Sequence, residues 1–326
     1  MKAVTFTQRE AVAVLEQDVP VIGPDEVLVK SRMVGVCHSD IELLEGRYIL
    51  PFAYPIIPGH EWAGEVYEVG AEVKGFAPGD HVVGECVVGP GGKDHFGFTI
   101  SGAMAEYFVV KGEWLHRVPD TMSWTLAALV EPFSVAYNAT FTGRVDPADR
   151  VAVIGAGPIG LMTALAAKGR GATVALYEPQ ESRRAKANEL GITTTLDPTS
   201  ESDVAAGVIV TGGDGFDVVI ETAGRPSAMA MALELAGHSA RVVLVGIDVG
   251  GSAPAALGLI QAKSLEVRGI IGSMNLWPQT IRFLGSGIVD PTRVVSHHLG
   301  VDAAASAFAL AKAGGTTTKV HVELNA

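Results

Sequence analysis

The chain has 326 residues, of which 48% are hydrophobic and 18% charged, so it can bury more than one core and does not resemble a disordered protein. Its net charge of −12, without runs of like charge, disfavours a nucleic acid or an anionic membrane surface as partner. The first 20 residues lack the apolar core of a signal peptide, and no later segment reaches the roughly 18 apolar residues of a membrane span. Two cysteines cannot form a disulfide framework, so we expect a cytoplasmic protein with free thiols.

Up to about residue 130, short β-branched runs are interrupted by glycine and proline, which predicts a twisted, barrel-like antiparallel region. From residue 150 the pattern changes to apolar strands that alternate with helices. Strands are expected within residues 150–160, 172–178, 216–224, 240–247 and 264–273, and helices within 161–171, 182–191 and 227–237. Parallel strands need such long crossovers, so this half predicts a doubly wound α/β domain.

After residue 274 the alternation weakens into a tail of roughly 50 residues, which is too short for a third core. We expect this tail to rejoin the first domain. The predicted organisation is therefore a first domain made of residues 1–133 and 275–326, and a nucleotide-binding domain of residues 134–274.

A glycine-rich turn is predicted at the first strand-to-helix junction of the α/β half. Gly155, Gly157 and Gly160 have GxGxxG spacing, with Pro158 and Ile159 between the last two glycines. Such glycines allow a tight turn, let a pyrophosphate approach the backbone and let the helix pack on the strand. The phosphates then face the free amides at the positive end of the helix. The spacing alone is weak in a chain with 39 glycines, but here its context is correct.

An acidic residue follows at the position expected for ribose binding. Glu178 ends the next predicted strand, 18 residues after Gly160 (178 minus 160). A carboxylate there accepts the ribose hydroxyls and repels a 2′-phosphate, which favours NAD over NADP. Arg183, which we include among the cofactor-binding candidates, and Arg184 lie close enough in sequence to soften that preference.

Side chains of the types that zinc prefers occur in separate loops. Cys37 precedes an acidic helix, His60 and Glu61 stand in a proline-glycine turn, and Glu131 lies just ahead of a predicted helix. Taken alone, Cys37 is more simply a buried core residue than a nucleophile or a ligand. A thiolate, an imidazole and a carboxylate nevertheless form a set suited to catalytic zinc. Spacings of 23 (60 minus 37) and 71 residues (131 minus 60) exclude a zinc finger and suit a site assembled from loops.

The whole chain resembles the zinc-dependent medium-chain dehydrogenase/reductase family, in the alcohol and polyol dehydrogenase branch that includes sorbitol and threonine dehydrogenases. The resemblance rests on the motifs GVCHSD, PGHEWAGEV, VKGFAPGDHV, EPFSVAYNA, VIGAGPIGLM, VIETAG and ARVVLVG. It implies a GroES-like β-barrel catalytic domain and a Rossmann domain. It also implies one catalytic zinc per chain and NAD-dependent oxidation of a polyol or secondary alcohol to a ketone.

By that likeness, Cys37 and His60 are catalytic zinc ligands, and Glu61 and Glu131 supply or alternate as the carboxylate ligand. The glutamate at 131 stands where alcohol dehydrogenases carry a second cysteine and sorbitol-type enzymes carry glutamate. The same likeness therefore points to a polyol or secondary alcohol as substrate.

The helix after Cys37 carries the other predicted catalytic side chains. Asp40 matches the family carboxylate that hydrogen-bonds the histidine ligand, and Ser39 matches the hydroxyl that takes the substrate's proton. Glu42 stands where many relatives have a proton-relay histidine, so we consider both a role in relaying protons or binding substrate and a purely solvated position. His38 is expected to make local hydrogen bonds only.

The chain departs from the family where most relatives have a four-cysteine lobe for a structural zinc. Here that region contains only Cys86, with His81 and His95 as weak candidates. A closed structural site needs four nitrogen or sulfur ligands, so we predict a short lobe without structural zinc and a simple thiol at Cys86. His297 and His298 are expected to be structural.

The substrate is open among sugar alcohols, short vicinal diols, cyclitols or aminocyclitols, and amino alcohols. Its pocket is expected to include the loops at residues 45–55 and 93–102. Two alternatives are a zinc-free quinone or enoyl reductase on the same fold, whose members usually lack the Cys and GHE pair, and a non-catalytic nucleotide-binding protein. A homodimer or homotetramer is expected from the family, with pairing of edge strands near residues 264–273.

Overall fold

The chain forms two compact units, each with its own sheet and core. The computed structural model describes residues 1–325, except the side chain of residue 205. Unit 1 is formed by Met1–Glu131 and Val295–Ala326, and unit 2 by Pro132–Val294. The return to the first unit therefore comes at residue 295 and not at the expected 275.

The helix α9 (Trp277–Gly285) explains this difference. It carries Phe283 against Phe133 and Tyr137 of α3 (Val130–Thr142), with ring centroids 6.0 Å and 5.3 Å apart. Asn138 of the same helix α3 donates a hydrogen bond to the Gly272 carbonyl. Residues 275–294 are thus packed on unit 2 before the chain leaves it.

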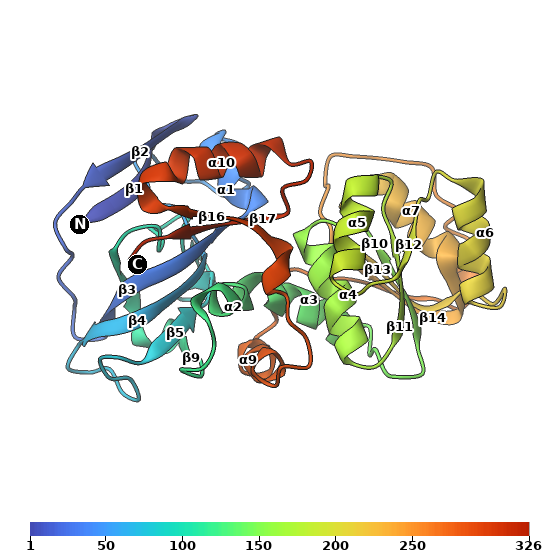
Figure 1. Cartoon of the computed structure of the whole chain (residues 1–326), viewed down its shortest axis with the longest axis horizontal. Helices are drawn as coiled ribbons and strands as arrows, with labels where there is room; N and C mark the ends of the chain where they lie inside the picture. The colour runs from blue at the N-terminus through green and yellow to red at the C-terminus, as the bar shows by residue number, and fades with distance from the viewer. Residues whose placement is uncertain (326) are drawn as a thin grey trace. The chain divides into compact units, whose positions relative to one another are not determined.

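Unit 1 is built around β3 (Glu26–Val36), the longest strand, which pairs with β17, β4 and β8. The main sheet has the order β16-β17-β3-β4-β5-β9, with β8 added on β3, and only the β16–β17 pair is parallel. The helix α10 (Ala304–Ala313) packs on β17 (Lys319–Glu323) and beside α1 (His38–Leu44) (Figure 1).

The strands of unit 1 are β1 (Lys2–Gln8), β2 (Ala11–Glu16), β3, β4 (Glu61–Val69), β5 (His81–Gly84), β6 (Val87–Val88), β7 (Asp94–His95), β8 (Tyr107–Lys111), β9 (Leu115–Arg117), β16 (Val295–Gly300) and β17. Its helices are α1 (His38–Leu44), η1 (Gly112–Trp114), α2 (Trp124–Ala128), η3 (Val301–Ala303) and α10 (Ala304–Ala313).

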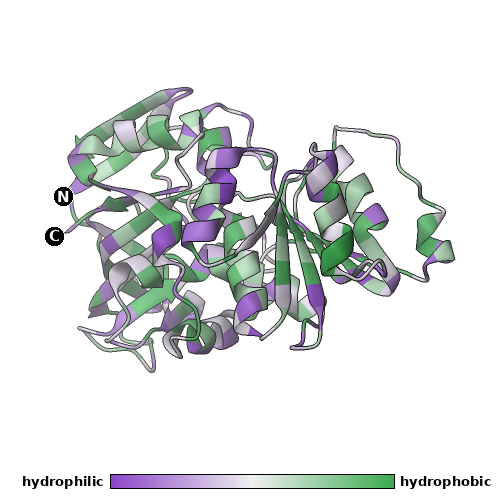
Figure 2. Ribbon diagram, turned by 45° about the vertical axis from the view of Figure 1, so that its right-hand side comes forward, coloured by the Kyte–Doolittle hydropathy of each residue, from purple (hydrophilic) through white to green (hydrophobic). Residues whose placement is uncertain are grey.

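Unit 2 has the predicted doubly wound architecture. Its six strands are all parallel and have the order β12-β11-β10-β13-β14-β15, in which the direction of winding reverses between β10 and β13. Hydrophobic residues, drawn in green, run through these strands (Figure 2). The strands are β10 (Arg150–Ile154), β11 (Thr173–Tyr177), β12 (Thr194–Leu196), β13 (Phe216–Glu221), β14 (Ala236–Leu244) and β15 (Glu266–Gly269). The helices, besides α3 and α9, are α4 (Pro158–Gly169), α5 (Glu181–Glu189), α6 (Glu201–Val210), α7 (Pro226–Leu235), α8 (Leu259–Ala262) and η2 (Thr292–Val294).

Among residues 1–325 no helix combines the length and the apolar character that crossing a bilayer requires.

Phe308 tests how firmly the C-terminal segment is anchored in unit 1. This residue of α10 is 2% exposed and meets Phe6 of β1 edge-to-face at 5.0 Å. Truncation leaves a cavity, so Phe308→Ala should lower the free energy of unfolding by about 3–5 kcal/mol, measured by urea denaturation. Phe141→Ala, at a side chain that is 51% exposed, is the matched control and should change it far less. Equal losses would show that Phe308 does not anchor this segment.

Candidate active site

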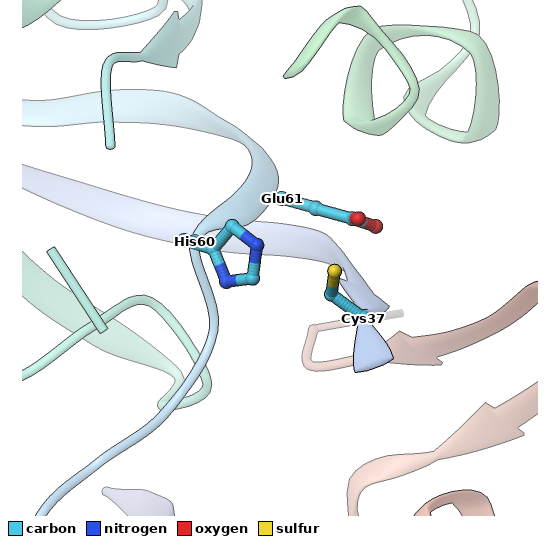
Figure 3. Close-up of side chains that lie close together, drawn as sticks. All are labelled: Cys37, His60 and Glu61. Carbon is cyan, nitrogen blue, oxygen red and sulfur yellow. The ribbon is translucent and has the colours of Figure 1, made fainter. Parts of the chain in front are cut away.

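Three of the predicted metal ligands come together in unit 1. The ligand atoms of Cys37, His60 and Glu61 all lie within 4.8 Å of one another, the only such group of three or more found in residues 1–325. Cys37 lies between the end of β3 and the start of α1, while His60 directly precedes β4 and Glu61 begins it. In Figure 3 the Cys37 sulfur points into the space beside the His60 ring and the Glu61 carboxylate. The structure therefore assembles a thiol, an imidazole and a carboxylate from two neighbouring strand ends.

The register between β3 and β4 leaves room for the Glu61 side chain. Gly35 of β3 lies directly opposite Glu61, so both positions face the same side of the sheet. A Cβ atom at Gly35 would collide with Glu61 Oε2. Glycine at this position lets the carboxylate lie over β3, toward Cys37.

His60 is oriented by Asp40, as the sequence predicts. The His60 Nδ1 atom lies 3.4 Å from Asp40 Oδ1, and both side chains are buried. Asp40 Oδ2 accepts a hydrogen bond of 2.8 Å from the Cys37 amide, which fixes the carboxylate at the start of α1. Burial alone would lower the pKa of His60, but Asp40 and Cys37 more than offset it and raise the pKa well above the usual value. Nδ1 faces Asp40, so Nε2 is the nitrogen left to bind a metal on the Cys37 side.

A buried lysine that sequence reasoning missed neutralises Glu61. Lys319 Nζ donates to both Glu61 oxygens at 2.7 Å and to the Val36 carbonyl at 3.2 Å. Glu61 and Lys319 are only 1% and 4% exposed. Burial lowers the pKa of Lys319, but Glu61 outweighs it and leaves that pKa raised. The signal in the sequence was Lys319 itself, at the start of a short strand with alternating valines (KVHVE), because a buried lysine needs a charged partner.

Glu131 lies outside the compact group formed by the other three predicted ligands. It stands in the first turn of α3, where some of its surface is exposed but its carboxyl is desolvated. This burial raises the pKa of Glu131 to about 7, and the charges of His60, Glu61 and Lys319 act on it. The carboxyl is therefore close enough to the group to respond to its charges.

Ser39 and Glu42 lie on one face of α1, because they are three residues apart in a helix. Both are partly buried, and Glu42 Oε1 lies 3.9 Å from Arg47 Nη1. The neighbouring His38 is exposed. The catalytic roles predicted for Ser39 and Glu42 stay predictions. The cation nearest to Glu42 in the described part of the chain is Arg47.

The residues considered for a structural zinc do not gather. In the part of the chain that the structure describes, His81, Cys86 and His95 belong to no group of three or more ligand side chains. Cys86 is partly buried, with its Sγ 3.9 Å from the Phe96 carbonyl, and burial raises the pKa of this thiol to about 12. The absence of a structural zinc stays a prediction.

The glycine turn has the geometry expected of a dinucleotide site. Gly155 has a φ of 101°, and a Cβ at Gly160 would collide with the Gly155 carbonyl, so both positions require glycine. A Cβ at Gly157 would meet nothing within 4 Å, which leaves this side of the turn open. Pro158 and Ile159 begin α4 after the N-cap Gly157, and the amide hydrogens at this helix start come from Ile159 onward because proline has none.

Glu178 and Arg183 lie beside this turn. The Glu178 oxygens accept hydrogen bonds from the Ala156 amide at 2.9 Å and the Gln180 amide at 3.0 Å. The Arg183 guanidinium lies 4.0 Å from Glu178, whereas Arg184 is turned toward Asp197. The acidic side chain is thus fixed at the end of β11, next to the glycine turn.

Comparison with known proteins identifies the family. The protein-family model of the alcohol dehydrogenase GroES-like domain matches residues 23–120. The family model of the zinc-binding dehydrogenase matches residues 158–286. Sorbitol dehydrogenase of Bacillus subtilis is 31% identical over 322 residues, covering 93% of this chain and 91% of the relative. The chain belongs to the zinc-dependent medium-chain dehydrogenase family. L-threonine 3-dehydrogenase of Pyrococcus furiosus is 34% identical over 340 residues, covering 97% of both chains.

A solved structure of this dehydrogenase family agrees over the whole chain. The 2R,3R-butanediol dehydrogenase from Bacillus subtilis superposes with a TM-score of 0.91 at 29% identity, covering 99% of each chain. The predicted GroES-like and Rossmann folds are therefore confirmed, and the protein is an alcohol-type oxidoreductase.

The buried pair beneath the site gives a stability prediction for this dehydrogenase. Lys319→Met leaves the Glu61 charge buried and unpaired, so it should lower the free energy of unfolding by about 3–5 kcal/mol. The double variant Lys319→Met/Glu61→Gln should recover much of that loss, because the unpaired charge is gone. Lys312→Met, which removes a half-exposed lysine of α10, is the matched control and should matter far less. Equal losses in the single and double variants would contradict the explanation.

Proposed function

We propose that the protein is an NAD-dependent zinc dehydrogenase that oxidises a polyol or secondary alcohol to the ketone. The observation that carries this proposal is the group of Cys37, His60 and Glu61, with ligand atoms within 4.8 Å, in a chain of the zinc-binding dehydrogenase family. Zinc-free reductases on this fold usually lack the cysteine and the GHE turn. Sorbitol and butanediol dehydrogenases among the relatives support a hydroxylated substrate.

The residues fit a zinc ion. Their donor set of sulfur, nitrogen and oxygen suits zinc, and His60 Nδ1 and Asp40 Oδ1 are buried without a hydrogen-bond partner although they face each other. A small ring movement as Nε2 takes a metal would close that bond, which is how an outer carboxylate orients a ligand. When bound, zinc would supply a Lewis acid that lowers the pKa of a substrate hydroxyl.

We infer that Glu131 is the better carboxylate ligand. Both oxygens of Glu61 are already engaged by Lys319, so ligation by Glu61 would weaken a buried ion pair. The carboxyl of Glu131 is desolvated, and burial raises its pKa to about 7. A divalent cation beside this carboxyl would stabilise its charged form.

We propose Ser39 as the acceptor of the substrate's proton, and Glu42, which shares its face of α1, as the next group in the relay. For the cofactor, Gly155, Gly157 and Gly160 form the phosphate-binding turn. Glu178 would accept the ribose hydroxyls and repel a 2′-phosphate, which supports NAD over NADP.

Cys37→Ser tests the metal and the reaction together. Zinc content and NADH production would be measured on one preparation against a panel of polyols and amino alcohols, with NADP in a parallel set. The variant should lose zinc and at least about a hundredfold in turnover, since loss of even an outer contact costs ten- to a hundredfold. NAD binding and folding should persist, because serine can begin a helix as well as cysteine.

Cys86→Ser is the matched control and should keep both zinc and turnover. A wild type that contains zinc but oxidises no alcohol on the panel would refute the proposed reaction. Full activity of Cys37→Ser would refute the metal assignment.

We also propose a homodimer or homotetramer formed through β15. This strand is the edge of the unit 2 sheet, and Ile271, two residues beyond it, is 79% exposed. An exposed strand edge invites pairing with another copy, and the exposed Ile271 beside it offers apolar surface that such a contact would bury. Ile271→Asp should therefore shift the mass in sedimentation toward the monomer. An unchanged mass, or a monomeric wild type at micromolar concentration, would contradict this interface.

A further inference from the structure

The lobe at residues 86–102, where most relatives carry the four-cysteine site, is held rigidly in unit 1. Its strands β6 and β7 form a small antiparallel pair. The His95 carbonyl accepts hydrogen bonds from the Phe98 and Thr99 amides at 3.0 Å and 2.9 Å, and the His95 amide donates to Thr99 Oγ1 at 2.8 Å. The backbone that carries the His95 side chain is therefore fixed in place.

Phe98 connects this lobe to the candidate metal centre. Its ring is 1% exposed and lies 4.5 Å from the His60 ring on one side. Its other contact is Tyr48, which stacks on it at 4.3 Å with an interplanar angle of 5°. A single buried phenylalanine thus separates Tyr48 from a predicted metal ligand.

Tyr48 and His95 form a polar pair across two loops. The Tyr48 hydroxyl lies 3.1 Å from His95 Nδ1, which joins the loop after α1 to the lobe. Burial raises the pKa of Tyr48 and lowers that of His95, so both groups are neutral near pH 7. The charge of His60 acts on both groups, and those of Cys37 and Asp40 act on Tyr48. Phe98, which contacts both Tyr48 and His60, places the pair one side chain away from the candidate metal centre.

The pair has hydrogen-bonding capacity left over. No group in residues 1–325 hydrogen-bonds His95 Nε2, and this atom is not buried. When Tyr48 donates to Nδ1, the remaining groups are the Nε2–H donor and a lone pair on the tyrosine oxygen. When Nδ1–H donates to Tyr48, they are the tyrosine O–H donor and the Nε2 acceptor. Either tautomer therefore offers one donor and one acceptor.

We propose that Tyr48 and His95 are a specificity-determining pair that binds a second hydroxyl of the substrate while the reacting hydroxyl lies at the metal centre. This inference rests on the proposed function. A hydroxyl can donate or accept, so it can bond to either free group of the pair in either tautomer. A carboxylate or phosphate only accepts, and its charge would find no cation in the pair. The pair therefore selects neutral vicinal diols and polyols over simple alcohols and anionic substrates.

The test compares two substrates that differ by one hydroxyl, 2,3-butanediol and 2-butanol. Tyr48→Phe keeps the stacking on Phe98 and removes the hydroxyl. It should lower kcat/KM for the diol about tenfold, the worth of a hydrogen bond to an otherwise unpaired group, and change that for 2-butanol less than about twofold. His95→Phe should act in the same direction and serves if the first variant misfolds. Tyr67→Phe, at a tyrosine that is 55% exposed, is the control and should leave both values unchanged.

A second measurement does not need turnover. Pinacol and 2,3-dimethyl-2-butanol share a carbon skeleton and have no oxidisable carbinol. As competitive inhibitors, they should differ in the wild type, with pinacol binding more tightly. Tyr48→Phe should remove most of that difference.

The outcomes separate the two proposals. If the wild type oxidises both alcohols and Tyr48→Phe lowers both equally or neither, the pair has only a structural role and this inference fails alone. If the zinc-loaded wild type oxidises neither these two alcohols nor any other alcohol on the panel, with NAD or NADP, the proposed function fails and this inference fails with it. A selective loss for the diol and for pinacol supports both.

Discussion

The buried ion pair between Lys319 and Glu61 constrains the rest of unit 1. Two charges less than 5% exposed are tolerated only where they meet with good geometry and where their remaining polar atoms have partners, because desolvation costs several kcal/mol per ion. Lys319 meets this condition with two short contacts to Glu61 and one to the Val36 carbonyl. The pair therefore forces β17, β3 and β4 to lie side by side with one relative register.

That register also positions the chemistry. Cys37 follows the end of β3 and Glu61 begins β4, opposite Gly35, so the thiol and the carboxylate meet at one end of the sheet. The C-terminal segment has to return to unit 1 because it supplies the compensating cation. A site placed on paired strands in this way is held more precisely than one on free loops. This arrangement requires glycine at residue 35, because any side chain there would displace the Glu61 carboxylate.

The sequence predicted the two halves of the molecule unequally well. Five of the six strands of unit 2 were predicted, because the turn at residues 155–160 and the alternation around it are local signals. The three-residue strand β12 was missed, since so short a segment carries little pattern of its own. The group of Cys37, His60 and Glu61 depends on a strand register that spacing does not determine, so only the family resemblance could propose it. The domain boundary was placed too early, because nothing local shows that α9 packs its Phe283 on α3. Lys319 was overlooked although a lysine in a buried strand requires a partner.

The lobe at residues 86–102 carries a single cysteine, so four cysteines around a zinc ion cannot hold it in place. Aromatic contacts hold the lobe on unit 1: Phe96 packs against Trp62 and Phe108, with ring centroids 6.1 Å and 5.7 Å apart. A structural metal would fix a lobe independently of the active site, since all its ligands lie within the lobe. Aromatic packing instead continues through Phe98 to the His60 ring. The shape of the lobe and the orientation of His60, a predicted metal ligand, are thereby coupled, so a change in the core around Phe98 acts on both.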